Sequence, residues 1–132
     1  MRRILVDSSI WIDYFRDERE HNVLDGLIAD NQICVNDVIL SELLPFLYHN
    51  DQQEVAEALL AIPKVDISMD WGALIHLQTA NLLRGIRRVG IPDLMILQNV
   101  LDHRLVLFSA DKHFQLMSQL FDFGLFEDTF TR

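Results

Sequence analysis

The sequence contains a single cysteine, Cys34, so it can form no internal disulfide and no metal site of paired cysteines. Cys34 lies in the stretch NQICVND, where a small side chain buried in a strand is a better explanation than a nucleophile. Proline and glycine are also scarce, with 3 and 5 residues, which excludes a collagen-like or low-complexity chain. Half of the residues are hydrophobic and 23% are charged, a balance typical of a globular fold.

Long hydrophobic runs are missing as well, because acidic or amide residues interrupt each apolar stretch before it could cross a bilayer. The opening MRRILVDSS is basic, but its apolar part, ILV, is too short for the core of a signal peptide. We therefore expect a cytoplasmic protein. The length of 132 residues predicts one domain, residues 1–132, with one hydrophobic core.

Basic residues are few: 11 Lys and Arg stand against 20 Asp and Glu, which gives a net charge of −9. This balance argues against a protein that coats DNA, because such proteins carry a basic footprint. It leaves a nuclease possible, because acids that surround divalent cations count fully in the formal charge.

Short apolar runs alternate with segments of helical periodicity along the chain. Strands are predicted at residues 3–6, 32–35, 64–68 (KVDIS) and 104–109, with a further edge strand at 124–130 (GLFEDTF). Helices are predicted at residues 8–15, 22–30, 37–50, 53–62, 70–88, 93–101 and 112–120. The alternation indicates parallel strands with helices on both faces, so the expected fold class is α/β, a three-layer α/β/α sandwich with a central parallel sheet.

Two of the predicted helices carry specific expectations. In the helix at 37–50, Asp37 is placed to cap the N-terminus, and Pro45 is expected to kink or locally break the helix. The helix at 70–88 is the most clearly amphipathic. Its core-facing stripe is expected to consist of Trp71, Leu74, Ile75, Leu82 and Ile86.

Four acids are expected at one edge of the sheet. Asp7 directly follows the first apolar run, and Asp111 follows the fourth, so both lie at carboxyl ends of strands. Asp93 begins a helix, and helices of such folds run antiparallel to the strands, which places their N-termini at the same edge. Glu42 lies about one turn into the helix after the second strand. Ligands of open parallel sheets bind at this edge.

Carboxylates that converge without a positive partner repel one another and raise one another's pKa. A divalent cation removes this cost, and Mg²⁺ prefers oxygen ligands. Such a site activates a water and neutralises charge on a phosphodiester under attack. Each acid also has a structural explanation: Asp7 and Asp111 as helix caps, Asp93 at the positive end of a helix, and Glu42 on a solvated face. Their common location favours the metal site.

The segments LVDSSIWIDYF, SELL, GIPDLMILQNVL and LFSADKHF, in this order, resemble the signature of the PIN domain family, especially of VapC-type toxins. The resemblance implies a Mg²⁺ or Mn²⁺ site with Asp7, Glu42, Asp93 and Asp111 as catalytic residues. Asp7 and Asp93 would be its metal ligands. Ser109 matches the small polar residue that precedes the last acid, where it helps to hold a water or a metal ligand.

The same resemblance implies an endoribonuclease that is the toxin of a type II toxin–antitoxin pair. Its partners would be an RNA substrate and a cognate VapB-type antitoxin that binds and inhibits it. The sequence departs from the family at Pro45, within the helix that carries Glu42, and in the compact stretch NLLRGIRRVGIPD before Asp93.

Arg84, Arg87 and Arg88 form the one concentration of positive charge, which indicates either contacts with RNA phosphates or a helix end that complements the dipole. Lys112 and His113, beside Asp111, are weaker candidates for the same role. The apolar stretch LLPFLY suggests a partner surface and fits a homodimer, an antitoxin contact or a buried helix equally well.

Two other functions are compatible with acids at strand ends. A phosphoacceptor receiver domain requires an acidic pair after the first strand, where this chain has DSS, so only Lys112 fits that pattern. A non-catalytic interaction module with the PIN fold has no need to keep all four acids. The hydrolytic site is therefore the leading interpretation.

Overall fold

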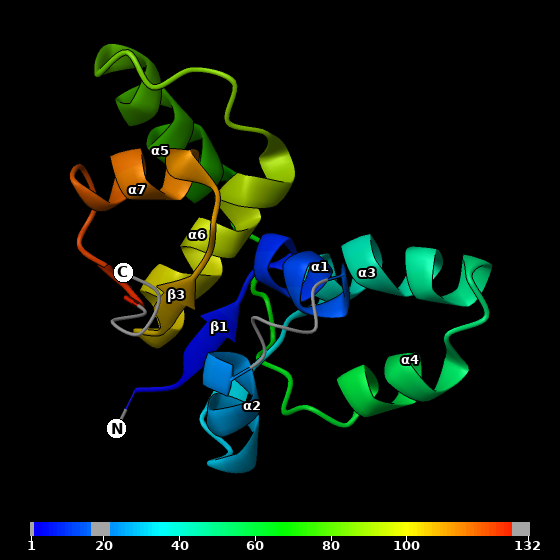
Figure 1. Ribbon diagram of the computed structural model, residues 1–132. Helices are drawn as coiled ribbons and strands as arrows, with labels where there is room; N and C mark the ends of the chain where they lie inside the picture. Colours follow the sequence, from blue (N-terminus) through cyan, green and yellow to red (C-terminus); the bar gives the residue numbers. More distant parts are fainter. Residues whose placement is uncertain (1, 17–21, 128–132) are drawn as a thin grey trace.

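The computed structural model describes residues 2–16 and 22–127 and forms a parallel sheet flanked by helices (Figure 1). The strand order is β2-β1-β3-β4, and every pairing is parallel. The strands are β1 (Ile4–Val6), β2 (Ile33–Cys34), β3 (Val106–Phe108) and β4 (Gly124–Leu125). The α/β fold and its parallel sheet are as the sequence predicts.

The two central strands form the middle of the hydrophobic core. Leu5 is fully buried and lies opposite Cys34 on one side and Leu107 on the other. Burial raises the pKa of the Cys34 thiol to about 11, so this cysteine is an unreactive core residue, as predicted. Strands buried on both faces are apolar throughout, which explains why each strand reads as a short continuous hydrophobic run.

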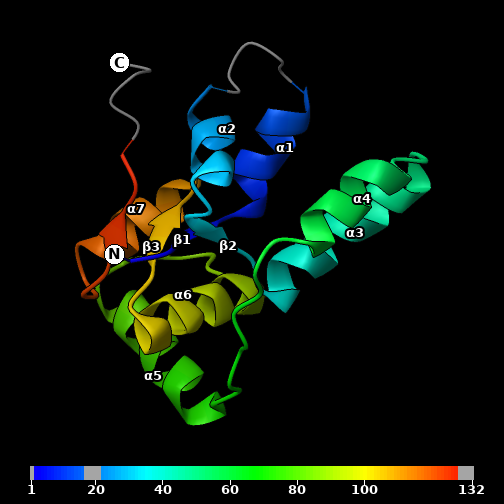
Figure 2. The same cartoon turned by 90° about the horizontal axis from the view of Figure 1, so that it is seen from below.

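Helices cover both faces of the sheet. The described helices are α1 (Ser8–Arg16), α2 (Asn22–Ala29), α3 (Asp37–His49), α4 (Gln53–Leu60), α5 (Trp71–Leu83), α6 (Ile91–His103) and α7 (Lys112–Ser118). Figure 2 shows α1 and α2 on one side of the strands and α5 and α6 on the other. The paired helices α3 and α4 project away from the sheet, so that they form one wall of a groove beside α1 and α2 (Figure 1).

The predicted strand KVDIS is wrong: this segment forms a single bridge, between Lys64 and Val35. The pairing goes no further because the chain after Val35 turns at Asn36 into helix α3, so no strand lies opposite the rest of KVDIS. The carbonyl of Asp66 accepts a hydrogen bond from the Asn99 side chain at 3.0 Å and lies 3.1 Å from the ring Nε2 of His103. The predicted edge strand GLFEDTF is present as β4, and its residues 128–130 lie outside the described residues.

The start of α3 also differs from the prediction. Asn36, and not Asp37, caps the helix, because its side-chain oxygen accepts the backbone N–H of Ile39 at 3.0 Å. Asp37 instead forms an ion pair with Lys64 at 3.2 Å. The helix continues through Pro45 to its end, so the predicted break is absent. Pro45 is exposed, and the backbone group that it leaves unpaired can be hydrated.

Helix α5 is shorter than predicted and turns a different face to the core. It ends at Leu83, and the chain then turns at Gly85, whose φ of 76° is readily adopted only by glycine. Its buried side chains are Leu74, Leu77 and Asn81. Three members of the predicted core stripe are solvent-exposed instead: Trp71, Ile75 and Leu82. The helix has two apolar faces, and α6 covers only one of them.

Two buried amides join the helices that carry the acids. Asn36, at the start of α3, donates from its side-chain nitrogen to the side-chain oxygen of Asn99 on α6 at 2.9 Å. Asn99 donates in turn to the Asp66 carbonyl. Both side chains are almost fully buried, so their hydrogen bonds have no competition from water. The pair therefore fixes the position of α3 relative to α6.

We predict that Asn99→Ala lowers the free energy of unfolding by about 2–3 kcal/mol, because it leaves the buried amide of Asn36 without its acceptor. Urea unfolding followed by circular dichroism measures the change. Gln98→Ala is the matched control, because Gln98 bonds at the surface to Asp102, and it should change stability by less than about 0.5 kcal/mol. Equal losses in the two variants would contradict a special role for the buried pair.

Candidate metal centre

Asp7 is a buried carboxylate at the carboxyl end of β1, with 5% of its surface exposed. Its backbone N–H donates to the carbonyl of Phe108 at 2.9 Å, which extends the pairing of β1 and β3 by one residue. One side-chain oxygen, Oδ2, accepts hydrogen bonds from the hydroxyls of Ser9 at 2.9 Å and Ser109 at 2.8 Å. Within residues 2–16 and 22–127 the other carboxylate oxygen, Oδ1, has no hydrogen-bond donor, so it can take a further ligand.

The two serines link the ends of β1 and β3. The Ser109 hydroxyl accepts the backbone N–H of Asp111 at 3.0 Å, and the Ser9 hydroxyl accepts that of Ala110 at 3.1 Å. Asp7 and Asp111 are therefore held at fixed positions on the same edge of the sheet. The sequence pointed to Ser109 but not to Ser9, whose only signal is its place two residues after Asp7 in DSS.

Asp111 has two partners, both from His113. Its Oδ1 accepts the backbone N–H of His113 at 2.9 Å and lies 3.2 Å from the ring Nδ1. Asp111 is thus the N-cap of α7, as expected if it were a helix cap alone. Asp93, Asp111 and His113 also offer ligand atoms that lie within 4.8 Å of one another. Sequence reasoning considered His113 only for RNA contacts, because the histidines lack metal-binding spacing.

Asp93 and Glu42 complete the group from the two helices that Asn36 and Asn99 connect. Burial raises the pKa of Glu42, and the charges of Asp7 and Asp93 raise it further, while a 3.4 Å hydrogen bond from Ser8 acts in the opposite direction.

The pKa of Asp93 is raised first by burial and then by the charges of Asp111 and Asp7. His113 and the backbone of Gly90 partly oppose this shift. The four predicted acids therefore lie close enough to act on one another electrostatically.

No positive side chain of the described residues neutralises this group by a direct Lys or Arg ion pair. Asp111 has only its contact with His113. Partly buried carboxylates of like charge are therefore held together by hydroxyl and backbone donors, an arrangement that a divalent cation would stabilise. Carboxylate oxygens suit both Mg²⁺ and Mn²⁺. The residues present fit either ion.

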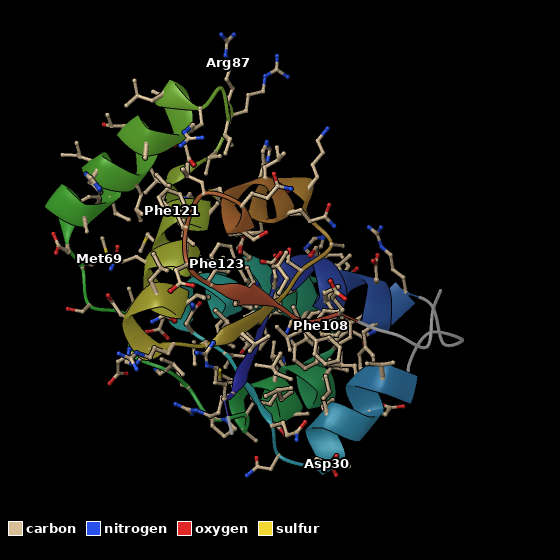
Figure 3. The ribbon with its side chains drawn as sticks, turned by 90° about the vertical axis from the view of Figure 1, so that its left-hand side faces the viewer. Asp30, Met69, Arg87, Phe108, Phe121 and Phe123 are labelled. Carbon is tan, nitrogen blue, oxygen red and sulfur yellow. The ribbon has the colours of Figure 1, made fainter. Side chains whose placement is uncertain are left out.

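A shallow recess of about 440 Å³ opens beside Glu42. Its walls are mostly apolar and include Met69, Pro92 and Met95. Arg87, in contrast, projects into solvent beyond α5, well away from Phe108 at the end of β3 (Figure 3). The contact between the arginine cluster and RNA phosphates stays a prediction.

The sequence matches the PIN domain family over residues 4–120. The chain belongs to the PIN domain family. Comparison with curated proteins gives no match. Membership of the PIN domain family argues against the receiver-domain alternative.

Solved structures similar to this PIN domain contain VapC toxins in VapBC toxin–antitoxin complexes. DNA-bound VapBC from Salmonella typhimurium is 16% identical, with a TM-score of 0.70, and 87% of this chain and 92% of that chain are covered. VapBC2 from Rickettsia felis, bound to a promoter DNA fragment, is 17% identical, with a TM-score of 0.73 and coverage of 93% and 96%. A toxin–antitoxin complex from Klebsiella pneumoniae is 25% identical, with a TM-score of 0.61 and coverage of 83% and 87%.

Among the residues that the structure describes, no helix combines the length and apolar character needed to span a membrane.

We predict that Glu42→Gln stabilises the metal-free PIN domain at neutral pH. A carboxyl group whose pKa is raised by folding favours the folded state while protonated, and this contribution is lost as the pH rises through the raised pKa. The gain in melting temperature of the variant over wild type should therefore shrink as the pH falls through that pKa. Thermal unfolding in chelator at a series of pH values measures it. Glu57→Gln, on the exposed face of α4, should show no such trend.

Proposed function

We propose that this PIN domain is a Mg²⁺-dependent endoribonuclease, with Mn²⁺ as a second competent ion, and that it is the toxin of a type II toxin–antitoxin pair. The supporting observation is the convergence of Asp7, Glu42, Asp93 and Asp111 at one sheet edge without a Lys or Arg ion pair. Of these four acids, Glu42 also lines the shallow recess, through which a substrate could reach its carboxyl group. The activity would take place in the cytoplasm, where RNA and antitoxin are both present.

Asp7 and Asp93 would hold the cation, with Asp111 and His113 close enough to complete its ligand set. When bound, a divalent ion supplies charge neutralisation at the phosphodiester and acidifies a bound water. Ser9 and Ser109 keep the Asp7 carboxylate oriented through its Oδ2. This fixed orientation removes the cost of ordering the carboxylate during the reaction.

Glu42 is the group that we expect to accept the proton of the attacking water. Its pKa is raised, chiefly by burial, which brings the carboxyl group closer to the pH at which a general base is most effective. The water oxygen then forms the new bond to phosphorus, and the bond between phosphorus and the leaving ribose oxygen breaks. Asp93 lies among these carboxylates, because the charges of Asp111 and Asp7 both raise its pKa.

The groove between α1, α2, α3 and α4 is the site that we propose for the antitoxin. It has a volume of about 800 Å³ and is lined largely by apolar side chains, among them Trp11, Phe15, Phe46 and Leu59. Phe46 belongs to the stretch LLPFLY, and half of its surface remains exposed. A concave apolar groove of this kind accepts the apolar face of a helix or an extended segment.

We predict that wild-type protein cleaves a pool of total RNA in the presence of Mg²⁺ or Mn²⁺ and that Asp93→Asn lowers the rate by at least about 100-fold. Loss of a group that only supports a ligand costs 10–100-fold, so loss of a ligand should cost more. Asp102→Asn, near the other end of the same helix, is the matched control and should retain the wild-type rate.

Titration calorimetry with Mg²⁺ or Mn²⁺ on the same three proteins separates binding from catalysis. Loss of both cation binding and cleavage in Asp93→Asn alone supports the proposal. Folded wild-type protein that binds no cation and cleaves no RNA would contradict it and favour the non-catalytic interaction module.

We predict that Phe46→Asp weakens binding of the cognate antitoxin by at least about 30-fold, because a charge replaces an aromatic anchor in the groove. Binding is measured by calorimetry, and RNA cleavage in the presence of antitoxin shows whether inhibition is relieved. Leu116→Asp, at an exposed apolar residue of α7, should bind the antitoxin like wild type. Equal binding by both variants would place the antitoxin on another surface.

A further inference from the structure

The recess beside Glu42 is lined by the first turns of α3, by the start of α6 and by the segment before α5. Its apolar residues are Val38, Ile67, Met69, Pro92 and Met95. Because Pro92 directly precedes Asp93, and Glu42 itself is part of the lining, the recess adjoins the candidate metal centre. No step of the proposed hydrolysis uses its apolar walls.

The polar groups on the α3 side of the recess are mainly hydrogen-bond acceptors. Asp37 lines the recess with a carboxylate. The Ser41 hydroxyl donates its proton to the backbone carbonyl of Asp37 at 2.6 Å, which leaves its lone pairs for a ligand. The ammonium group of Lys64, 3.2 Å from Oδ1 of Asp37, adds a donor beside these acceptors.

Of the parts of an RNA chain, a nucleobase matches this lining best. A phosphate group is repelled by the carboxylates of Asp37 and Glu42. A ribose carries hydroxyls that apolar walls leave without partners. A nucleobase has two apolar faces and a polar edge, and bases that leave the stack bind against apolar side chains with this edge hydrogen-bonded. The volume of about 440 Å³ is within the usual size of small-ligand sites.

Asp37 and Lys64 together match the edge of one particular base. Guanine is the RNA base that carries two N–H donors side by side, on N1 and N2, so it can bond to both oxygens of one carboxylate. The carbonyl O6 lies next to N1 on the same edge. The order of Lys64 Nζ, Asp37 Oδ1 and Asp37 Oδ2 therefore corresponds to the order of O6, N1 and N2.

Both side chains are accessible to a base. The exposed fraction of the side chain is 69% for Asp37 and 47% for Lys64. A carboxylate has about four lone-pair positions, and the ion pair uses one of them, so both oxygens of Asp37 can still accept hydrogen bonds. The second proton of the N2 amino group can be accepted by Ser41. Adenine, cytosine and uracil offer a single donor group on the corresponding edge, so they leave one carboxylate oxygen without a partner.

We propose that this recess is a guanine-binding subsite for the nucleotide next to the scissile phosphate, an inference that rests on the proposed function. The base packs against the methionine and proline walls, with its edge toward Asp37 and Lys64. Glu42 lies five residues after Asp37, about 7.5 Å further along the axis of α3. A bound guanine thus holds the adjoining phosphodiester near the carboxyl group that activates the water.

Binding of RNA in Ca²⁺ tests the subsite separately from cleavage. Ca²⁺ takes oxygen ligands, as Mg²⁺ does, and replaces it in this assay. The probes are short fluorescent oligouridines whose central residue is guanosine, inosine or uridine, and fluorescence anisotropy gives the dissociation constants. Wild type should bind the guanosine probe at least about 10-fold more tightly than the uridine probe. Inosine, which lacks the N2 amino group, should give an intermediate value.

Asp37→Ala should bind the three probes equally. The variant keeps the cap of α3, because Asn36 and not Asp37 accepts the N–H of Ile39. Glu57→Ala, which removes an exposed charge from α4, is the matched control and should retain the wild-type preference. Because the readout is a ratio of affinities, the change in net charge cancels.

Equal binding of the three probes by wild type, or a guanosine preference that persists in Asp37→Ala, overturns the proposal. If Asp37→Ala keeps this preference and loses affinity for the cognate antitoxin, the recess belongs to the antitoxin and the proposal is again overturned.

Mapping of cleavage sites in Mg²⁺ separates this inference from the proposed function. Wild type should cut a random-sequence RNA pool with guanine at one fixed position beside the cut, and Asp37→Ala should cut without this preference. Cleavage by wild type without any base preference overturns the subsite and leaves the ribonuclease activity standing. Guanosine-selective binding that depends on Asp37, without any cleavage, supports the subsite and contradicts the ribonuclease activity.

Discussion

The acidic centre depends on one oxygen atom, Oδ2 of Asp7, and on the two hydroxyls that donate to it. Ser9 lies two residues away in sequence, whereas Ser109 lies 102 residues away, at the end of β3. The same oxygen atom therefore makes one local hydrogen bond and one that joins the ends of β1 and β3. These bonds compensate for the burial of the carboxylate, which would otherwise be unfavourable. They also fix its second oxygen at the sheet edge, where the charge of Asp7 raises the pKa of Asp93 and of Glu42.

Glu42 and Asp93 are positioned by a hydrogen bond in the core, away from the acidic centre itself. Glu42 and Asp93 lie on helices that contact each other only modestly, and the hydrogen bond between Asn36 and Asn99 ties these helices together in the core. A buried amide pair is directional in a way that apolar packing is not, so it specifies a single relative position. The centre is therefore built from like charges whose repulsion is resisted by polar bonds on every supporting element.

The sequence was sufficient for the fold class and for the proximity of the four acids, because buried parallel strands and strand-end carboxylates leave local patterns. Their role in catalysis stays a prediction. It was insufficient where two local patterns compete. Helix α5 carries two apolar stripes, and only the packing of α6 decides that Leu74 and not Trp71 is buried. Asn36 and Asp37 are equally plausible caps in sequence. The strand at KVDIS did not form because the chain opposite it turns into α3 after Val35, and the loss of this partner leaves no signal within KVDIS itself.

The order of the strands also determines when the centre can exist during synthesis. β1, the second element of the sheet order, pairs with β3, which the ribosome makes after three quarters of the chain. Asp7 cannot accept the hydrogen bond from the Ser109 hydroxyl until Ser109 has left the exit tunnel. Asp111, whose backbone N–H donates to the same hydroxyl, reaches its position only after that. Contacts so distant in sequence form late in folding. A nascent chain therefore carries Asp7 for most of its synthesis without the neighbours that surround it in the finished protein.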